Sequence, residues 1–474
     1  MRSITQKTAS AILLTAFALT ASACGGSAGT STDQPDTQTT AETTAEPEKV
    51  YNLEGYTLNV AKIAQENIPW VLVSFGVEEE NGEILNDTIY ARNRNVSEKN
   101  NFSISETEIS GGTISTIRNL VNAGDDEYQV VFDQAATMSS TISEGILYDL
   151  RTIDSLELDN ASWNQNMISS LSVGDRVYLV GGDITVSDED SVEVLVYNTS
   201  YARDLQIEDL YQVVRDGKWT VDKMYNVCKL AVNDVNGDSA MNLEDSYGTL
   251  ANYDGISAML ISCGTSAISK NANGKIEITA DSERFTEAFD KLSRIYTEPT
   301  YHSYDGVTVE LQVSRLETNK NLFVNAVTSF ARRFLRDVKT DFGFLPTPKL
   351  DEKQDKYISA AVQSTCVLAI PASVKDPETA GLALQLLANG SGDITKAYYD
   401  ICLQSKYTRD EESYEMLQIS IENIEYNVGY IYNSQFADLH SVLLNELTNG
   451  TGNIASVLAS NRSAVEDAIQ KYLG

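Results

Sequence analysis

Residues 113–133 read TISTIRNLVNAGDDEYQVVFD, and this stretch decides the fold class. Its first part has apolar residues spaced as on one face of a helix, and that pattern ends at Gly124, a residue typical of helix C-termini. Residues 128–132 (YQVVF) then have the composition of a buried strand. Residues 56–61 (YTLNVA) precede them with the period-two pattern of another strand. The order strand, helix, strand predicts an α/β fold.

The same alternation continues along the chain. Residues 193–197 (EVLVY) predict a strand, and residues 282–296 predict a long amphipathic helix with Asp281 as its N-cap. Strands that alternate with helices favour mainly parallel sheets covered on both sides. The chain from Val50 onward is too long for one such core, so we expect two lobes. The predicted apolar face of the helix carries Phe285, Ala288, Phe289, Leu292 and Ile295.

Composition excludes several classes of function. The 474 residues include 35 Lys and Arg against 68 Asp and Glu, which gives a formal net charge of −33. Because affinity for nucleic acid depends on clustered cations, no nucleic-acid partner is expected. The two histidines are His302 and His440. They exclude a histidine-rich metal centre and leave a Ser-His-Asp hydrolase only two candidate bases.

The N-terminal segment predicts export. Arg2 and Lys7 precede the apolar run 11–20 (AILLTAFALT), which is about half the ~20 residues that a membrane-spanning helix needs. Small residues then lead to Cys24, in a pattern that resembles the lipobox of bacterial lipoproteins. We therefore expect a signal peptide over 1–23 and lipidation of Cys24, which would anchor the protein to the outer face of the cell membrane. Ala21 and Ala23 are equally compatible with ordinary signal cleavage.

The segment that follows the predicted signal peptide lacks large apolar residues. Residues 24–49 contain no Val, Ile, Leu, Met or aromatic residue, so they predict a disordered tether.

The four later cysteines lack CxxC spacing and sit in partly apolar surroundings, which favours buried free thiols. A disulfide stays open, because the sequence fixes no pairing. These cysteines are Cys228, Cys263, Cys366 and Cys402.

Residues 234–245 (DVNGDSAMNLED) have the spacing of a calcium loop. Side-chain oxygens fall at loop positions 1, 3, 5, 9 and 12, a backbone carbonyl is available at position 7, and Ca²⁺ prefers six to eight oxygen ligands. The loop resembles EF-hand and dockerin loops, although Ser239 stands where the sixth position is usually Gly. A structural Ca²⁺ is expected, and a solvated turn after the helix 221–231 is the alternative. The predicted ligands are Asp234, Asn236, Asp238, Ala240, Asn242 and Asp245.

Several local patterns together resemble the extracellular solute-binding proteins of bacterial ABC importers, family 1, the sugar-binding branch. No single pattern is diagnostic, but their order covers essentially the whole body of the chain. The patterns are 123–128 (AGDDEY), 162–166 (SWNQN), 196–198 (VYN), 216–220 (DGKWT), 343–349 (GFLPTPK), 368–371 (LAIP) and 409–413 (RDEES).

The resemblance implies a two-lobe fold of the type II periplasmic-binding-protein class. Two α/β lobes close on a solute held between them, and strands that cross between the lobes act as the hinge. By analogy, the crossings lie near 183–193, 361–371 and 403–409. Lobe one would comprise 50–184 plus 373–401, and lobe two 185–372 plus 402–474.

Contacts with the solute follow from the same analogy. Sugar sites combine aromatic faces with carboxylates, amides and guanidinium groups that satisfy hydroxyls. We assign Trp219 to structure, because Thr220 after it is a plausible helix cap. The expected ligand-binding residues are Asp133, Trp163, Asn164, Asp183, Phe330, Arg333, Tyr432 and Phe436.

Each of these residues has a structural alternative. Trp163 is equally compatible with a place in the core of a lobe, and so are Tyr432 and Phe436, which are four residues apart on one helical face. Asp183 follows two glycines and could be a turn carboxylate, and Arg333 could pair with an acid one turn further on.

The sequence thus predicts a monomeric, non-enzymatic solute receptor that captures a sugar or oligosaccharide and delivers it to an ABC permease. Two alternatives stay open. A surface glycoside hydrolase would need two carboxylates about 5 to 10 Å apart in a cleft, and the acidic composition supplies many candidates. The same two-lobe fold could instead serve as the ligand-capture subunit of a membrane sensor.

Overall fold

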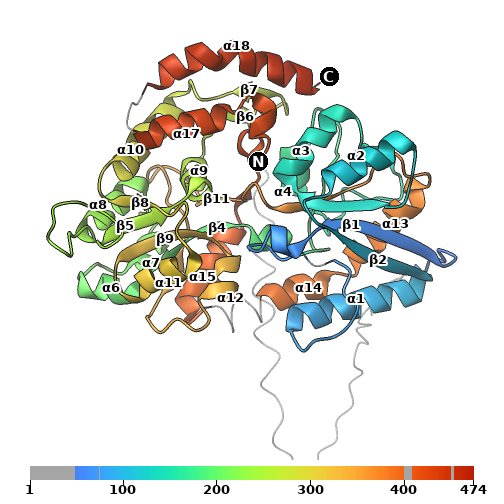
Figure 1. Ribbon diagram of the computed structural model, residues 1–474, viewed down its shortest axis with the longest axis horizontal. Coiled ribbons are helices and arrows are strands. Elements are labelled where there is room, and N and C mark those ends of the chain that lie inside the picture. Colours follow the sequence, from blue (N-terminus) through green and yellow to red (C-terminus); the bar gives the residue numbers. More distant parts are fainter. Residues whose placement is uncertain (1–48, 74, 400–407, 450–452, 474) are drawn as a thin grey trace, which may run out of the picture. The chain divides into compact units, whose positions relative to one another are not determined.

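The computed structural model contains two main β-sheets, each covered by helices (Figure 1). It describes residues 49–73, 75–399, 408–449 and 453–473. Residues 50–474 form one unit. The predicted signal segment, Cys24 and the tether up to residue 48 lie outside the described residues, as do Cys402 and most of the predicted crossing at 403–409.

The first sheet has the strand order β12-β3-β1-β2. β1 pairs in parallel with both β2 and β3, and β12 is antiparallel to β3. The predicted order of strand, helix and strand is confirmed. Helix α2 ends at Gly124 as predicted, and the φ of +66° at this residue is the left-handed conformation that glycine permits. The strands are β1 (Tyr56–Ile63), β2 (Phe102–Ile109), β3 (Val130–Gln134) and β12 (Cys366–Ala369), and α2 is Ile114–Ala123.

The second sheet has the order β10-β4-β9-β5-β8. β5 is parallel to β8 and β9, whereas β4 is antiparallel to β9 and β10. The prediction of mainly parallel sheets is therefore too simple, because chain segments that return across the sheets add antiparallel strands to both. The strands are β4 (Glu193–Tyr197), β5 (Tyr247–Ala251), β8 (Tyr301–Ser303), β9 (Asn321–Val327) and β10 (Gly343–Leu345).

Two short pairs of strands complete the β-structure. β6 is antiparallel to β7, and β11 is parallel to β13. Their bounds are β6 (Ile268–Lys270), β7 (Ile276–Ile278), β11 (Ser359–Ala360) and β13 (Ile424–Glu425).

Helices surround the two sheets. Those that follow strands of the first sheet or neighbour it are α1 (Ile84–Asn100), α2, α3 (Ala135–Glu144), α4 (Gln165–Leu171), α13 (Pro377–Asn389) and α14 (Gly392–Lys396). Those of the second region are α6 (Thr199–Asp204), α7 (Leu210–Arg215), α8 (Val221–Leu230), α9 (Tyr253–Ser262), α10 (Glu283–Thr297), α11 (Val309–Glu317), α12 (Ser329–Phe334), α15 (Glu411–Ile421), α16 (Val428–Ile431), α17 (Leu439–Asn449) and α18 (Ile454–Leu473). Short 3₁₀ turns occur at Gln65–Asn67, Leu150–Thr152 and Asn433–Phe436.

The apolar core explains why β4 is a strand. Leu195 and Tyr197 pack into one hydrophobic cluster, whereas Val194 and Val196 pack into another, so both faces of the strand are buried. The second of these clusters also contains Leu85 of α1. Helix α1 follows the first strand in the chain, and its apolar side chain thus packs in the same cluster as the second sheet.

Helix α10 has the predicted apolar face, but its N-cap is not the predicted residue. All five predicted core residues are buried. The N-cap, however, is Ser282 and not Asp281, because the Ser282 hydroxyl accepts a hydrogen bond from the amide of Phe285 at 3.2 Å. Asp281 instead pairs with Arg462 of α18 at 2.6 Å.

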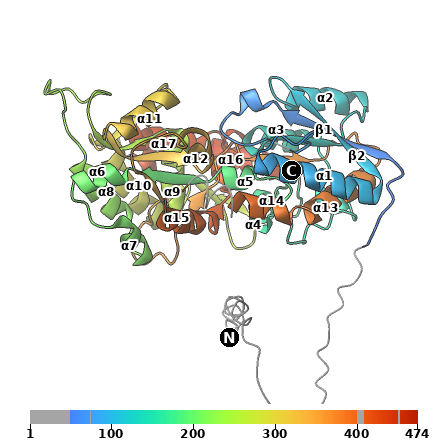
Figure 2. The same cartoon turned by 90° about the horizontal axis from the view of Figure 1, so that it is seen from below.

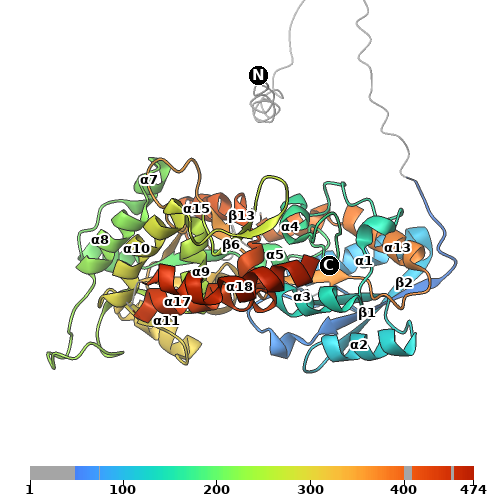
Figure 3. The ribbon, with the colours of Figure 1, turned by 90° about the horizontal axis from the view of Figure 1, so that it is seen from above.

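Two elements connect the regions around the sheets. Figure 2 shows α5 (Ser187–Asp190) between elements of the first sheet and elements of the second. Figure 3 shows α18 extending from α17 toward α3, where the Tyr472 hydroxyl donates to the carbonyl of Ser139 at 2.9 Å.

Within the described ranges, no helix combines the length and apolarity needed to cross a bilayer.

One predicted lobe boundary differs from the sheet pairing. Residues 185–372 are expected in lobe two, but β12 pairs with β3 in the first sheet. The chain therefore returns to the first sheet at Cys366. That thiol is buried and free, as are those of Cys228 and Cys263.

Candidate functional site

A cavity of about 300 Å³ lies where the segment after β1 meets the second sheet. Residues of the segment 69–70, of the start of β4, of α9, α11 and α12, and of the stretch before β12 line it. Its aromatic side chains are Trp70, Tyr304, Phe330 and Phe334. Its polar and charged side chains are Glu193, Asn252, Asp254, Gln312, Arg333 and Ser364.

The aromatic part of the cavity combines one fixed indole with a pair of phenyl rings. Trp70 is 43% exposed, although its Nε1 donates to the Ser364 hydroxyl at 2.9 Å. The rings of Phe330 and Phe334 lie 5.2 Å apart at an interplanar angle of 54°. A large, partly exposed aromatic ring held in place by its polar atom is suited to covering the apolar face of a sugar ring.

The carboxyl groups of Glu193 and Asp254 provide the acidic part. Glu193 begins β4 and is 2% exposed, and burial followed by the nearby Asp254 raises its pKa well above the usual value of 4.5. Burial also raises the pKa of Asp254, although the hydroxyl of Tyr430 donates to its Oδ1 at 2.5 Å and opposes this shift. Two carboxyls of raised pKa in one cavity are a feature of functional sites.

Arg333 contributes the cationic group. Its guanidinium lies 5.1 Å from the centre of the Phe334 ring. Burial lowers its pKa, and the neighbouring Arg332 adds to the effect. Among the described residues it forms no ion pair, including with Asp337 one turn on, although Asp190 lies close enough to oppose the lowering of its pKa.

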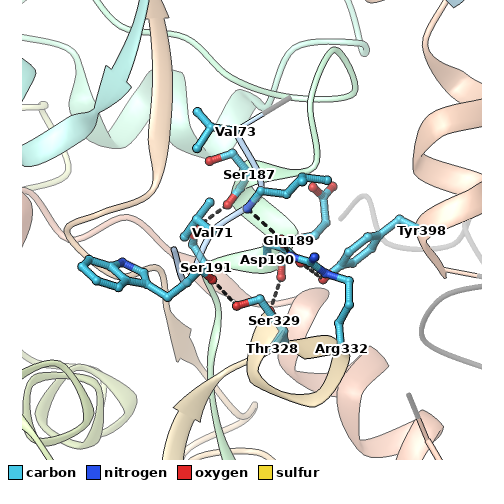
Figure 4. Close-up of polar contacts among 12 residues, drawn as sticks. Val71, Val73, Ser187, Glu189, Asp190, Ser191, Thr328, Ser329, Arg332 and Tyr398 are labelled. Carbon is cyan, nitrogen blue, oxygen red and sulfur yellow. Dashed lines mark hydrogen bonds and ion pairs between the residues drawn. The ribbon is translucent and has the colours of Figure 1, made fainter. Parts of the chain in front are cut away.

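A buried polar network holds the cavity walls together (Figure 4). Asp190 at the end of α5 is fully buried, and its Oδ2 accepts from the Leu72 amide at 3.0 Å and from Arg332 at 2.6 Å. The Tyr398 hydroxyl donates to its other oxygen at 2.9 Å.

A second contact fixes the segment that carries the indole directly, since the Ser329 hydroxyl of α12 donates to the carbonyl of Trp70. This contact ties the segment that carries Trp70 directly to α12, and Asp190 of α5 joins the same two segments through Leu72 and Arg332.

Two of the predicted ligand-binding residues, Phe330 and Arg333, line the cavity. Their role in binding stays a prediction. The other predicted residues lie elsewhere and have polar or apolar partners of their own.

The predicted residues of the first sheet region have structural partners. Asp133 is buried, and its Oδ2 accepts from the amide and hydroxyl of Thr113 at 2.9 and 2.8 Å, which fixes the start of α2. Trp163 lies in the core with its Nε1 donating to Gln385 at 2.8 Å. Both side chains are engaged away from the cavity, because their polar atoms are used to join elements of the first sheet region.

Asn164 and Asp183 lie near α5. Asn164 caps α4 through a 3.0 Å contact with the Met167 amide, and its amide group donates to Asp188 at 2.9 Å. The Asp183 carboxyl accepts from the Thr395 hydroxyl at 2.9 Å, and burial raises its pKa.

The predicted aromatic pair, Tyr432 and Phe436, lies in the hydrophobic core. The Tyr432 hydroxyl donates to the carbonyl of Leu171 at 2.9 Å, and the rings of Phe436 and Tyr472 meet edge-on at 5.5 Å. Trp219 is structural as predicted, with Thr220 capping α8. The buried indole of Trp219 donates to the carbonyl of Pro346 at 2.9 Å.

Sequence reasoning missed Trp70, Glu193 and Asp254. A signal for Glu193 existed, because it is the one charged residue of the otherwise apolar strand 193–197. Trp70 follows a proline just after the first strand, where cleft loops start in an α/β fold. Asp254 carries no local signal, since it resembles any acidic residue in the first turn of a helix.

In the predicted calcium loop, the carboxyl groups of Asp234 and Asp245 accept hydrogen bonds from backbone amides of the loop itself. Ser239 adopts a φ of +67°, the left-handed conformation that the sixth position requires. The two oxygens of Asp234 accept from the amides of Gly237 and Ser239 at 2.7 and 2.8 Å, and those of Asp245 accept from Val235 and Asn242, both at 2.9 Å. Among the described residues, no three His, Cys, Asp or Glu side chains are grouped as a metal site.

Comparison with solved structures shows that this chain shares its two-lobe α/β fold with several sugar-binding proteins of ABC transporters. The galacto-N-biose/lacto-N-biose I-binding protein of Bifidobacterium longum, in complex with lacto-N-biose, has a TM-score of 0.58 at 13% identity, over 88% of this chain and 98% of its own. An ABC substrate-binding protein of Listeria monocytogenes, in complex with cycloalternan, has a TM-score of 0.55 at 12% identity, over 88% and 100%.

A third similar structure is a solute-binding protein of Thermotoga lettingae bound with α-D-tagatose, with a TM-score of 0.54 at 14% identity, over 89% and 100%. No family model and no curated protein sequence matches the chain. The similarity is one of fold, and it confirms the two-lobe α/β class that the sequence patterns predicted.

The raised pKa of Glu193 predicts a pH-dependent cost to stability. Its folded-state pKa lies above the usual 4.5, so the folded form resists ionisation, and stability falls as pH rises from 4.5 through the raised pKa. Glu193→Gln should therefore raise the melting temperature at pH 8 and have little effect at pH 4, as calorimetry can measure. Glu80→Gln, at an exposed position, is the control. A loss of stability at pH 8, or the same gain at both pH values, would contradict the assignment.

Proposed function

We propose that the protein is an extracytoplasmic sugar-binding lipoprotein of an ABC importer, which captures a sugar or oligosaccharide between two lobes and delivers it to a membrane permease. The cavity lined by Trp70, Phe330 and the carboxyls of Glu193 and Asp254 carries the proposal. Aromatic faces and convergent polar groups are what saccharide recognition needs. The shared fold with sugar-binding proteins supports it.

The proposed mechanism depends on which chain segments form the walls of the cavity. Trp70 belongs to the segment after β1, whereas Phe330 and Arg333 belong to α12. The contacts of Asp190 and Ser329 already join these two walls in the arrangement described, and a solute that contacts both walls would add to them and shift the population toward that closed arrangement. The permease, or a sensor in the alternative assignment, would recognise that closed state. The protein is expected to act as a monomer.

Trp70→Ala should weaken saccharide binding by roughly ten- to a hundredfold, because it removes the indole, the largest of the aromatic side chains that line the cavity. A thermal-shift screen of mono- and oligosaccharides finds the solute, and calorimetry then measures Kd for the wild type and the variant. Leu230→Ala, which truncates an exposed side chain of α8 outside the cavity, is the control and should bind normally.

Mass spectrometry of the saccharide after the titration distinguishes binding from hydrolysis. A receptor returns it intact, whereas a glycoside hydrolase using Glu193 and Asp254 would consume it. A melting temperature that no saccharide raises, beside a response to amino acids or peptides, would overturn the sugar assignment.

The proposal includes a lipid anchor at Cys24. Diacylation of this cysteine would hold a strongly acidic protein at an anionic membrane surface that its charge does not favour. Cys24→Ser should move the protein from the membrane fraction to the soluble fraction on cell fractionation. Retention of the variant in the membrane fraction would rule out this anchor.

We also propose that loop 234–245 binds Ca²⁺ in a structural role, on the basis of its ligand spacing and the left-handed Ser239. Binding to the folded state alone raises stability. Ca²⁺ should therefore raise the melting temperature of the wild type but not that of Asp238→Ala, whereas Asp290→Ala, at an exposed site outside the loop, should respond like the wild type. A melting temperature that is indifferent to Ca²⁺ in all three proteins would remove the metal.

A further inference from the structure

One carboxyl oxygen of Glu193 lacks a hydrogen-bond partner in the part of the chain that the structure describes. Glu193 lines the cavity at 2% exposure, and its Oε2 is buried without a hydrogen bond among the described residues. The remaining residues of β4 are apolar or aromatic and pack into the core. A buried carboxyl without a partner is costly unless it is neutral or meets a donor. Its place on the cavity wall makes a solute the natural source of that donor.

Acidic and hydroxyl groups surround Glu193. Asp254 faces it from α9, and Tyr430 of α16 occupies one oxygen of that carboxyl. The phenols of Tyr296 on α10 and Tyr304 after β8 lie close enough to interact electrostatically with Glu193. Each of these phenols has a pKa raised by burial and is neutral at physiological pH. None of them supplies a positive charge.

Arg333 is the single cation among the described residues that line the cavity. It forms no ion pair with Glu193 or Asp254, and its guanidinium lies over the ring of Phe334. The cavity therefore holds two carboxyls against one guanidinium that neutralises neither of them directly.

We propose that the solute is an amino sugar, whose ammonium group is received by Glu193 and Asp254; this rests on the proposed function of the cavity as a saccharide site. A sugar hydroxyl can donate one hydrogen bond, but an ammonium donates up to three and also stabilises the ionised form of a carboxyl that it contacts. Trp70 and Phe330 remain available for the ring faces. A cavity of about 300 Å³ is at the small end for ligand pockets, which suits one or two sugar rings.

The proposal predicts that binding of the solute releases a proton. Burial favours the neutral form of Glu193 in the ligand-free protein, and an ammonium beside it favours the ionised form. Binding of an amino sugar therefore releases up to one proton from the carboxyl to the solvent. Binding becomes tighter as pH rises, until the amine of the sugar itself loses its proton. A neutral saccharide produces no such release.

The test compares three disaccharides of the same linkage by calorimetry on the whole protein: β-1,4-linked glucosamine disaccharide, its N-acetylated form and cellobiose. At pH 7 we expect the free amine to bind at least about tenfold more tightly than cellobiose, the size of one charge-assisted hydrogen bond. Titrations in two buffers of different ionisation enthalpy should report proton release for the amine alone.

Glu193→Gln should remove both the preference for the amine and the proton release. Glu425→Gln is the matched control, because Glu425 is also a carboxyl whose pKa is raised by burial but lies in β13, outside the cavity. It should leave both readouts unchanged. If Glu193→Gln does not fold, the proton release of the wild type still decides, and Glu193→Asp should retain it.

The outcomes separate the two proposals. If cellobiose or the N-acetylated disaccharide binds as tightly as the amine, without proton release, the amino-sugar inference is wrong and the sugar receptor stands. If the amine is preferred but Glu193→Gln keeps the preference, the assigned carboxyl is wrong and the inference fails. If none of these disaccharides and no other saccharide of the screen binds, the proposed function itself fails.

Discussion

The buried carboxylate of Asp190 is the interaction on which the site depends. It lies at the end of the short helix α5, and it binds the Leu72 amide of one segment and the Arg332 guanidinium of another. A buried charge is tolerated only with such partners, and removing one partner of a buried pair typically costs about 3 to 5 kcal/mol. The geometry of these contacts therefore fixes three chain segments relative to one another.

The cavity is a consequence of that arrangement. Because the Leu72 segment and α12 are held against α5, Trp70 lies in the same cavity as Phe330 and Arg333. Glu193 begins the strand that follows α5, so its carboxyl enters the same space. Its buried Oε2 has no hydrogen-bond partner among the described residues, which disfavours folding at neutral pH, and the proposed binding role would account for its presence.

The fold could be predicted from the sequence because periodicity and caps are local signals. The helix 113–123 with Gly124 and the strand 193–197 are where the patterns placed them. The cap of α10 was misplaced by one residue, because Asp281 and Ser282 are both good caps and tertiary pairing with Arg462 decides between them. Antiparallel strands such as β12 depend on long-range pairing, and no local pattern encodes it.

The site was harder to predict, because residue type does not say which aromatic is exposed. Trp163 and Tyr432 have the composition of a sugar platform but satisfy their polar atoms inside the core, whereas Trp70 does so at the cavity wall. Phe330 and Arg333, which the family resemblance suggested, line the cavity, and their role in binding stays a prediction. Asp254 reaches the site only because α9 packs beside β4, which the sequence does not reveal.

The three tryptophans allow the most direct test of the central claim, that a saccharide binds beside Trp70. Trp163 and Trp219 are buried at 1% and 0% exposure, whereas Trp70 is 43% exposed. We would titrate the protein with the saccharide that stabilises it most and record tryptophan fluorescence for the wild type and Trp70→Phe. The account predicts a saturable change that the variant loses while calorimetry still detects binding. An unaltered fluorescence change in the variant would place the solute elsewhere and contradict the account.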